Sequence, residues 1–133
     1  MTTLIWIAGG LHLAIAAANV GVSRVLRFDD EFARLSPIVR DIVRAHHAYI
    51  IGVLVVAGLL CLLFAPDLAS GSPLGGFLSA GLAVFWGARL YLQLVRYDPA
   101  VRRRYRAVDV LFTLAAAFLA ALFLAAAAMP QLG

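Results

Sequence analysis

The sequence predicts an all-α, polytopic membrane protein, a bundle of four transmembrane helices, and three observations lead to this prediction. Of the 133 residues, 64% are hydrophobic and only 14% are charged, whereas a soluble domain is about 45–50% apolar and about 25% charged. Four apolar stretches are each long enough to cross a bilayer as a helix. Lipid also leaves no partner for an unpaired backbone group, which favours helices. This composition excludes a soluble globule, a disordered tail and a nucleic-acid-binding module.

The four predicted spans form a single integral membrane domain, residues 1–133, and cover residues 4–22, 48–64, 74–95 and 108–128. The first span contains Ala16-Ala17-Ala18, which resembles a signal-peptidase site. A signal peptide normally carries a positively charged side chain before its apolar stretch, and Met1-Thr2-Thr3 has none. We therefore expect this helix to be retained.

The connections between the spans carry helix-start signals. Ser36-Pro37 has the pattern of an N-cap followed by proline at the first helical position, so the second helix is expected to begin there, before its span. Gly71-Ser72-Pro73 predicts a turn that restarts a helix, and Tyr97-Asp98-Pro99 predicts a break after the third span. Acidic residues within Phe28–Phe32 predict a short amphipathic helix.

The chain has eleven arginines and no lysine, and ten of the arginines fall in the two connections at residues 23–45 and 96–107. The connection at residues 65–73 has none. By the positive-inside rule the two basic loops are cytoplasmic, and both termini are periplasmic. We therefore expect a multi-pass protein of the bacterial inner membrane.

Polar residues within the spans are the candidate functional groups, because such residues are costly in lipid. All of them except His12 fall in the cytoplasmic half. The predicted ligand-binding pocket consists of Asn19, His46, His47, Tyr49, Trp86, Arg89, Gln93 and Asp109.

Arg89 is the arginine within a span. Its spacing places it on one face with Trp86, Gln93 and Arg96, and about 10 Å deeper than Arg96. Two interpretations stay open. It forms a structural ion pair, with Asp109 as the best partner and Asp41 and Asp98 as rivals, or it binds the anion of a headgroup, carboxylate or phosphate.

The histidines do not predict a metal or haem site. His46 and His47 point about 100° apart on a helix and cannot easily chelate one ion together, and His12 lies about 15 Å away along the axis. His46 is expected to pack against a neighbouring helix; hydrogen bonding to headgroups, acid–base chemistry and metal ligation are the alternatives. Cys61 is the single cysteine, expected to be a packing residue. We expect no cofactor.

Two resemblances arise from these residues. Arg44-Ala45-His46-His47-Ala48-Tyr49 and Ala88-Arg89-Leu90-Tyr91 loosely resemble the MAPEG family, small four-span enzymes that use glutathione or act on lipids. That family's second helix typically carries an Asn and a Glu after the opening Arg, whereas this span holds no acid. The chain is also similar to an uncharacterised family of small four-span bacterial membrane proteins, through Leu11-His12, Asn19, Leu35-Ser36-Pro37, the Tyr49 region, Gly71-Ser72-Pro73, Phe85-Trp86, Arg89, Gln93 and Tyr97-Asp98.

Three functions follow as hypotheses. The first is a non-catalytic accessory subunit or a protein that binds lipid or a small ligand. The second is a MAPEG-like membrane enzyme with His46 or Tyr49 as acid–base and Arg89 as anion clamp. The third is an oligomeric transporter or channel subunit. The expected partners are the lipid bilayer and other membrane subunits or further copies of the chain, with no nucleic acid.

Overall fold

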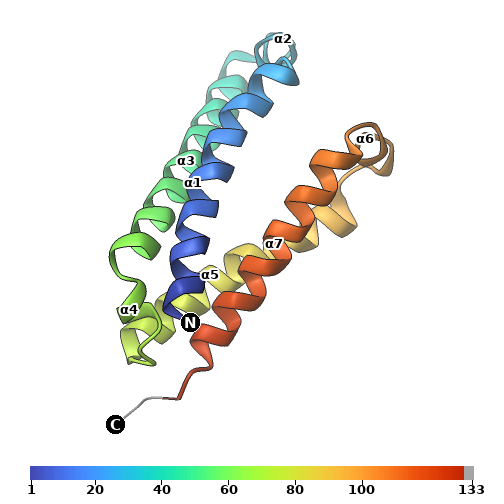
Figure 1. The fold of residues 1–133 in the computed structure, drawn as a ribbon. Helices are drawn as coiled ribbons and strands as arrows, with labels where there is room; N and C mark the ends of the chain where they lie inside the picture. The colour runs from blue at the N-terminus through green and yellow to red at the C-terminus, as the bar shows by residue number, and fades with distance from the viewer. Residues whose placement is uncertain (131–133) are drawn as a thin grey trace. The chain divides into compact units, whose positions relative to one another are not determined.

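The computed structural model describes residues 1–130, and this part of the chain is helical without strands (Figure 1). Four helices are long and apolar enough to cross a membrane. They are α1 (Thr2–Val25), α3 (Pro37–Leu63), α5 (Pro73–Tyr91) with its π-helical continuation η1 (Leu92–Arg96), and α7 (Arg106–Ala127). Three short helices are α2 (Phe28–Phe32), α4 (Ala65–Leu68) and α6 (Pro99–Arg104). The all-helical fold with four helices of spanning length is therefore confirmed.

The chain divides into two compact units. One is Trp6–Leu63, and the other joins Met1–Ile5 to the chain from Phe64 onward. We call α1, α2 and α3 the first hairpin, and α5, η1, α6 and α7 the second hairpin. Each is described by itself, and the single domain of residues 1–133 stays a prediction.

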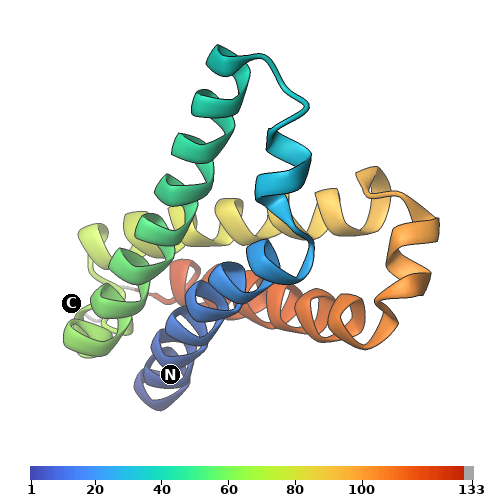
Figure 2. The same cartoon turned by 90° about the horizontal axis from the view of Figure 1, so that it is seen from above.

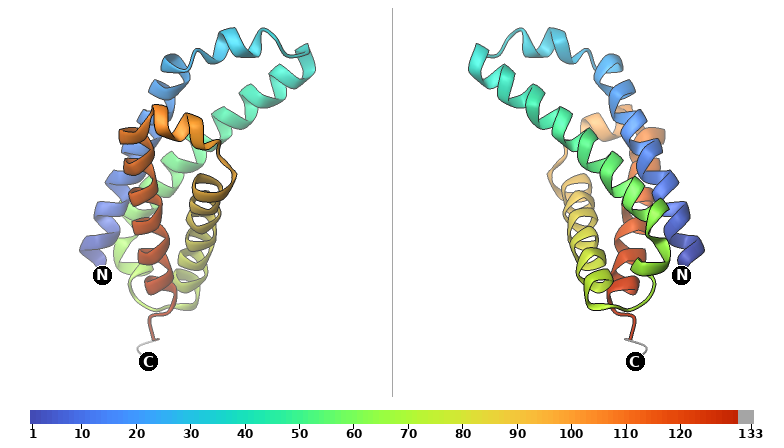
Figure 3. Two further views of the ribbon diagram at one scale, coloured as in Figure 1. Left: turned by 90° about the vertical axis from the view of Figure 1, so that its right-hand side faces the viewer. Right: turned by 90° about the vertical axis from the view of Figure 1, so that its left-hand side faces the viewer.

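In the first hairpin, α1 and α3 approach each other closely at a pair of glycines. A Cβ atom at Gly9 would lie 2.8 Å from Leu62 Cγ and 3.0 Å from the carbonyl oxygen of Gly58. A Cβ at Gly58 would lie 2.9 Å from Leu13 Cδ2. Missing side chains therefore let the two backbones approach, as small residues do in membrane helices. Toward their basic ends the helices diverge, and α2 crosses the gap between them (Figure 3).

In the second hairpin, α5 and α7 run side by side (Figure 2). The predicted turns are confirmed. Gly71 has a positive φ of 71°, which suits glycine, and Ser72 Oγ accepts a hydrogen bond from Gly75 N at 3.1 Å to cap α5. Asp98 Oδ1 accepts one from Ala100 N at 2.8 Å to cap α6. Side-chain caps of this kind satisfy backbone donors that a helix start leaves open.

The boundaries of the elements agree with the sequence in most places. The second long helix begins at Pro37, well before its predicted span, and the acidic segment forms α2 as predicted. Two features were not predicted, namely the short helix α4 and the π-helical segment η1. η1 contains Gln93 and directly follows the last turn of α5, which carries Arg89.

Candidate functional site

Gln93 is the centre of a polar network at the basic end of the second hairpin. Arg89 Nη1 donates a hydrogen bond to Gln93 Oε1 at 2.9 Å, and Gln93 Nε2 donates to Asp109 Oδ1 at 2.6 Å. The Gln93 side chain thereby joins α5 to α7 with both ends of its amide. Gln93 is only 6% exposed. These bonds satisfy a buried amide that would destabilise the folded protein if it were left without partners.

Asp109 pairs with an arginine of α6 rather than with Arg89. Arg102 Nε lies 2.9 Å from Asp109 Oδ1, and its Nη2 lies 3.3 Å from Oδ2, in a two-pronged arrangement. The side chains are 28% and 12% exposed, respectively. This hydrogen bond raises the pKa of the Arg102 guanidinium. The sequence offered Asp109 as the best partner of Arg89, but the structure places Gln93 between them.

The π-helical segment η1 positions an aromatic ring beside Arg89. Tyr97 N donates to Leu92 O at 3.0 Å, five residues back, so the turn holds one residue more than an α-helical turn. The Arg89 guanidinium lies 5.0 Å from the centre of the Tyr97 ring, a cation–π contact. The α-helical spacing that predicted Arg96 on the same face ends at Tyr91, and Arg96 is exposed.

The network carries one uncompensated positive charge. Two arginines, Arg89 and Arg102, share one carboxylate, Asp109, and both oxygens of that carboxylate already accept hydrogen bonds. Among the described residues, no ion pair involves Arg89. The helix around Arg89 is long and apolar enough to span a membrane. A cation in this position is a candidate for binding an anion from outside the chain.

An open hollow of about 540 Å³ adjoins this network. It is lined by Pro99, Arg102, Arg103, Arg106, Asp109 and Val110. Three of these six residues are arginines and only one is acidic, so the hollow favours negatively charged groups. From the sequence alone, we interpret these arginines only as indicators of the orientation of the chain in the membrane. The Asp98-Pro99 start of α6 was the signal that would have placed Arg102 on a helix next to α7.

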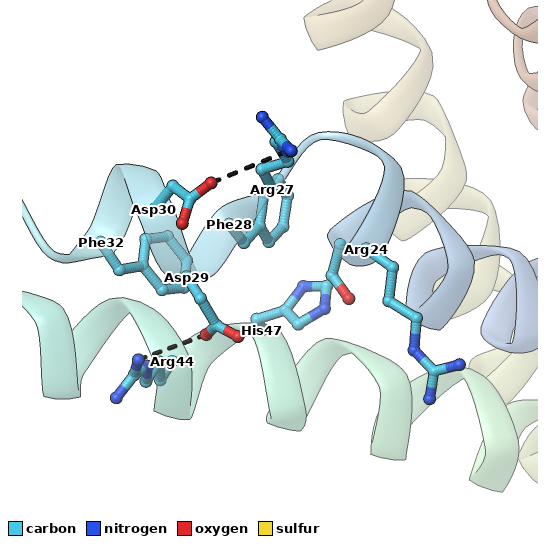
Figure 4. A pocket seen from close by; sticks show the side chains of 9 residues that line it. Arg24, Arg27, Phe28, Asp29, Asp30, Phe32, Arg44 and His47 are labelled. Atoms are coloured by element: carbon cyan, nitrogen blue, oxygen red, sulfur yellow. Dashed lines mark hydrogen bonds and ion pairs between the residues drawn. The ribbon is translucent and has the colours of Figure 1, made fainter.

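The first hairpin holds a second open pocket of about 540 Å³, where α2 crosses between α1 and α3 (Figure 4). We call it the α2 pocket; it is lined by Ser23, Arg24, Arg27, Phe28, Asp29, Asp30, Phe32, Arg44 and His47. The His47 and Phe28 rings meet edge to face at 5.3 Å between centres. The Arg44 guanidinium lies 5.9 Å from the centre of the Phe32 ring. Two aromatic side chains of α2 therefore form a wall beside the charged groups of α3.

His47, rather than His46, is the half-buried histidine of α3. The prediction was that His46 would be the packed residue. His47 is packed instead because α2 lies against the face that carries His47 and Arg44. His46 is exposed, and its Nδ1 lies 2.7 Å from the carbonyl oxygen of Ile42, one turn earlier in the same helix. Tyr49 is 74% exposed. An acid–base role for His46 or Tyr49 stays a prediction.

The remaining predicted residues lie within the apolar parts of the helices. Asn19 Nδ2 donates to the carbonyl oxygen of Ile15 at 2.9 Å. His12 is fully buried, and its Nδ1 lies 2.7 Å from the carbonyl oxygen of Ala8. Trp86 is 3% exposed on α5.

The eight residues of the predicted pocket divide between the two units. The first hairpin holds Asn19, His46, His47 and Tyr49, and the second holds Trp86, Arg89, Gln93 and Asp109. Only the last three are linked to one another by hydrogen bonds described above. A pocket that all eight share stays a prediction.

Among residues 1–130, no three His, Cys, Asp or Glu side chains lie close enough together to hold a metal ion. The expectation that the protein needs no cofactor stays a prediction. Comparisons of the chain with models of protein families, with curated proteins and with solved structures find no match.

Proposed function

We propose that this chain is a non-catalytic integral membrane protein that binds the anionic headgroup of a lipid at the basic end of its second hairpin. One observation supports this proposal most directly. Arg89 is hydrogen-bonded to neutral Gln93, while Asp109 is held by Arg102. An arginine within a membrane span is costly unless an anion or a polar path accompanies it. A lipid phosphate would supply that anion.

Arg89 has donors left for such a ligand. A guanidinium carries five N–H groups in a planar fork that matches phosphate oxygens, and one nitrogen of Arg89 is engaged with Gln93. The Tyr97 ring lies 5.0 Å from the guanidinium carbon. This contact restricts the orientation of the guanidinium, which lowers the entropy lost when a ligand binds.

The distribution of arginine supports a membrane location with a defined orientation. Apart from Arg89, both hairpins carry their arginines toward the end where α2 or α6 lies, and the connection through α4 has none. By the positive-inside rule the basic ends face the cytoplasm of a bacterial inner membrane. The start of α1 and the end of α7 then face the periplasm. The hollow beside Arg102 would lie at the level of the lipid headgroups.

The test is a lipid titration read by native mass spectrometry of the protein in mild detergent. Wild type is expected to retain phosphatidylglycerol more strongly than phosphatidylcholine. Arg89→Gln should weaken phosphatidylglycerol binding at least about tenfold, because a hydrogen bond to a charged group contributes about 1.5–3 kcal/mol and every 1.4 kcal/mol is a factor of about ten.

The matched control is Arg104→Gln, which removes the same charge from α6. Arg104 lies over the Tyr105 ring, 5.5 Å from its centre, and takes no part in the network. Equal weakening by both substitutions would mean that net charge alone attracts the lipid, and would contradict the proposed site.

A further inference from the structure

The α2 pocket differs from the hollow beside Arg102 because it contains two exposed carboxylates, whereas the one acid of the hollow, Asp109, is held by Arg102. Asp29 and Asp30 line it together with Arg24, Arg27 and Arg44. A site for a purely anionic group gains nothing from two carboxylates, since like charges repel. The pattern instead fits a ligand that carries both a negative and a positive group.

The two carboxylates are only loosely held by their own arginines. Asp29 Oδ1 lies 3.3 Å from Arg44 Nη2, and Asp30 Oδ2 lies 3.8 Å from Arg27 Nε. The aspartate side chains are 93% and 70% exposed, respectively. Exposed pairs of this kind contribute little to stability. Each carboxylate therefore keeps lone pairs with which it can accept hydrogen bonds from a ligand.

The cationic side of the pocket lies apart from these pairs. Arg24 forms no ion pair among the described residues. In Figure 4 the Arg24 guanidinium lies on one side of the His47 ring, and the carboxylates of Asp29 and Asp30 lie on the other side. The pocket thus has a free cation at one end and two accessible carboxylates at the other.

We propose that the α2 pocket binds a phosphate ester that carries a primary ammonium group, as in the headgroup of phosphatidylethanolamine. The phosphate would bind at Arg24 and His47, and the ammonium group would donate to Asp29 and Asp30. A primary ammonium group has three N–H donors, whereas the quaternary ammonium of choline has none. The proposal rests on the proposed membrane location, which brings the pocket to headgroup level, but not on the site at Arg89.

The experiment is a competition between phosphatidylethanolamine and phosphatidylcholine of equal acyl chains, read by native mass spectrometry of the full chain. Wild type is expected to bind phosphatidylethanolamine about tenfold more strongly. Asp30→Asn, and more so the double substitution Asp29→Asn with Asp30→Asn, should reduce this preference several-fold. Arg24→Gln should weaken binding of both lipids, because both contain the phosphate.

Glu31→Gln and Arg34→Gln are the matched controls. This exposed pair on the same segment, 3.9 Å apart, does not line the pocket, so both variants should keep the wild-type preference. Adding water-soluble glycerophosphoethanolamine separates two sources of the same chemistry. Displacement of the lipid would identify a soluble phosphate ester as a sufficient ligand, and retention of the lipid would identify the membrane lipid; both outcomes support the proposed recognition.

Two results would overturn this proposal. One is an unchanged preference in the double aspartate variant, and the other is an equal loss in the Glu31→Gln control. The phosphatidylglycerol titration of Arg89→Gln tests a different site, which lies in the second hairpin. Failure there would contradict the proposed anionic-lipid site and leave the ethanolamine comparison intact.

Discussion

The two hairpins both end in arginine-rich segments, but they use these charges differently. In the first hairpin, the ion pairs lie on the surface: Arg27–Asp30 has side chains 81% and 70% exposed, and Arg34–Glu31 has side chains 78% and 63% exposed. In the second hairpin, Arg102 and Asp109 are largely shielded from solvent, and a hydrogen bond from Gln93 connects this pair to η1.

The long helices of the two hairpins also pack differently. In the first hairpin, α1 and α3 approach closely at Gly9 and Gly58, where an added Cβ would meet neighbouring atoms at 3.0 Å or less. In the second, α5 and α7 run side by side, and a Cβ at Gly76 would lie 3.8 Å from the carbonyl oxygen of Ala127, an ordinary contact. The second hairpin adds hydrogen bonds at its basic end, where Gln93 links its two long helices. The first hairpin holds five arginines and the second six, and only the second places arginines in a shielded network of this kind.

The largest expected effect is that of Asp109→Ala on the second hairpin. The substitution leaves Arg102 without its carboxylate and Gln93 without its acceptor, so two polar groups in a shielded position lose partners. The thermal midpoint in detergent should fall by several degrees, and hydrogen exchange should rise in η1. Asp30→Ala in the first hairpin is the control and should change neither the thermal midpoint nor the hydrogen exchange of η1. Equal midpoints for the two variants would contradict the contrast between shielded and exposed pairs.

Gly9→Ala tests the contact of the first hairpin. The new methyl group would lie 2.8 Å from Leu62 Cγ, and overpacking of this kind typically costs about 1–3 kcal/mol. Gly10→Ala is the matched control, because nothing lies within 4 Å of a Cβ there. Denaturant titration should show a loss of unfolding free energy for Gly9→Ala alone. A loss of similar size in both variants would mean that the closest approach lies elsewhere.

Gln93→Glu tests whether Arg89 is a free cation. A carboxylate in place of the amide would pair with Arg89 from within the chain, so a lipid phosphate would meet no uncompensated charge. It would also replace the hydrogen bond to Asp109 Oδ1 by repulsion between two carboxylates, so the thermal midpoint is measured alongside to separate loss of the fold from loss of the site. Phosphatidylglycerol binding should fall about tenfold, as expected for Arg89→Gln, although Arg89 itself remains. Gln93→Met, similar in shape but without charge, should keep most of the binding. Undiminished binding in the Glu variant would exclude the proposed anion site.

The smallest effect is expected for Arg34→Gln. Its partner Glu31 is 3.9 Å away, and both side chains are well exposed. Such pairs contribute less than about 1 kcal/mol, so the unfolding free energy should stay nearly unchanged. Denaturant titration at low and high salt checks this prediction. A salt-sensitive loss of stability would show that the surface pairs of the first hairpin matter more than their exposure indicates.

The helices were predictable from the sequence because the signals for them are local. Apolar length identified the spans, and Pro37, Ser72 and Asp98 each mark a helix start through caps or a fixed φ. The network was predicted only in part. Arg89, Gln93 and Asp109 were identified because polar residues stand out in apolar spans. Arg102 was missed, since nothing local separates it from the arginines on either side.

The histidines show a similar limit. The residues of the pair point to different faces of α3, and the sequence favoured His46 as the packed one. Which face is covered depends on where α2 returns toward α3, and this is a contact between segments far apart in the chain. Local periodicity contains no information about that contact.

The π-helical segment η1 brings Tyr97 back to the face of α5 that carries Arg89. Along an uninterrupted α-helix, a residue eight positions after Arg89 would be turned from it by about 80°, because each residue adds about 100°. The wider turn of η1 takes up one extra residue, so the Tyr97 ring meets the guanidinium at 5.0 Å. A chain one residue shorter between Leu92 and Arg96 would close this turn as an α-helix and keep Tyr97 on nearly the same face. This segment is therefore a place where the length of the chain can change by one residue without turning Tyr97 away from Arg89.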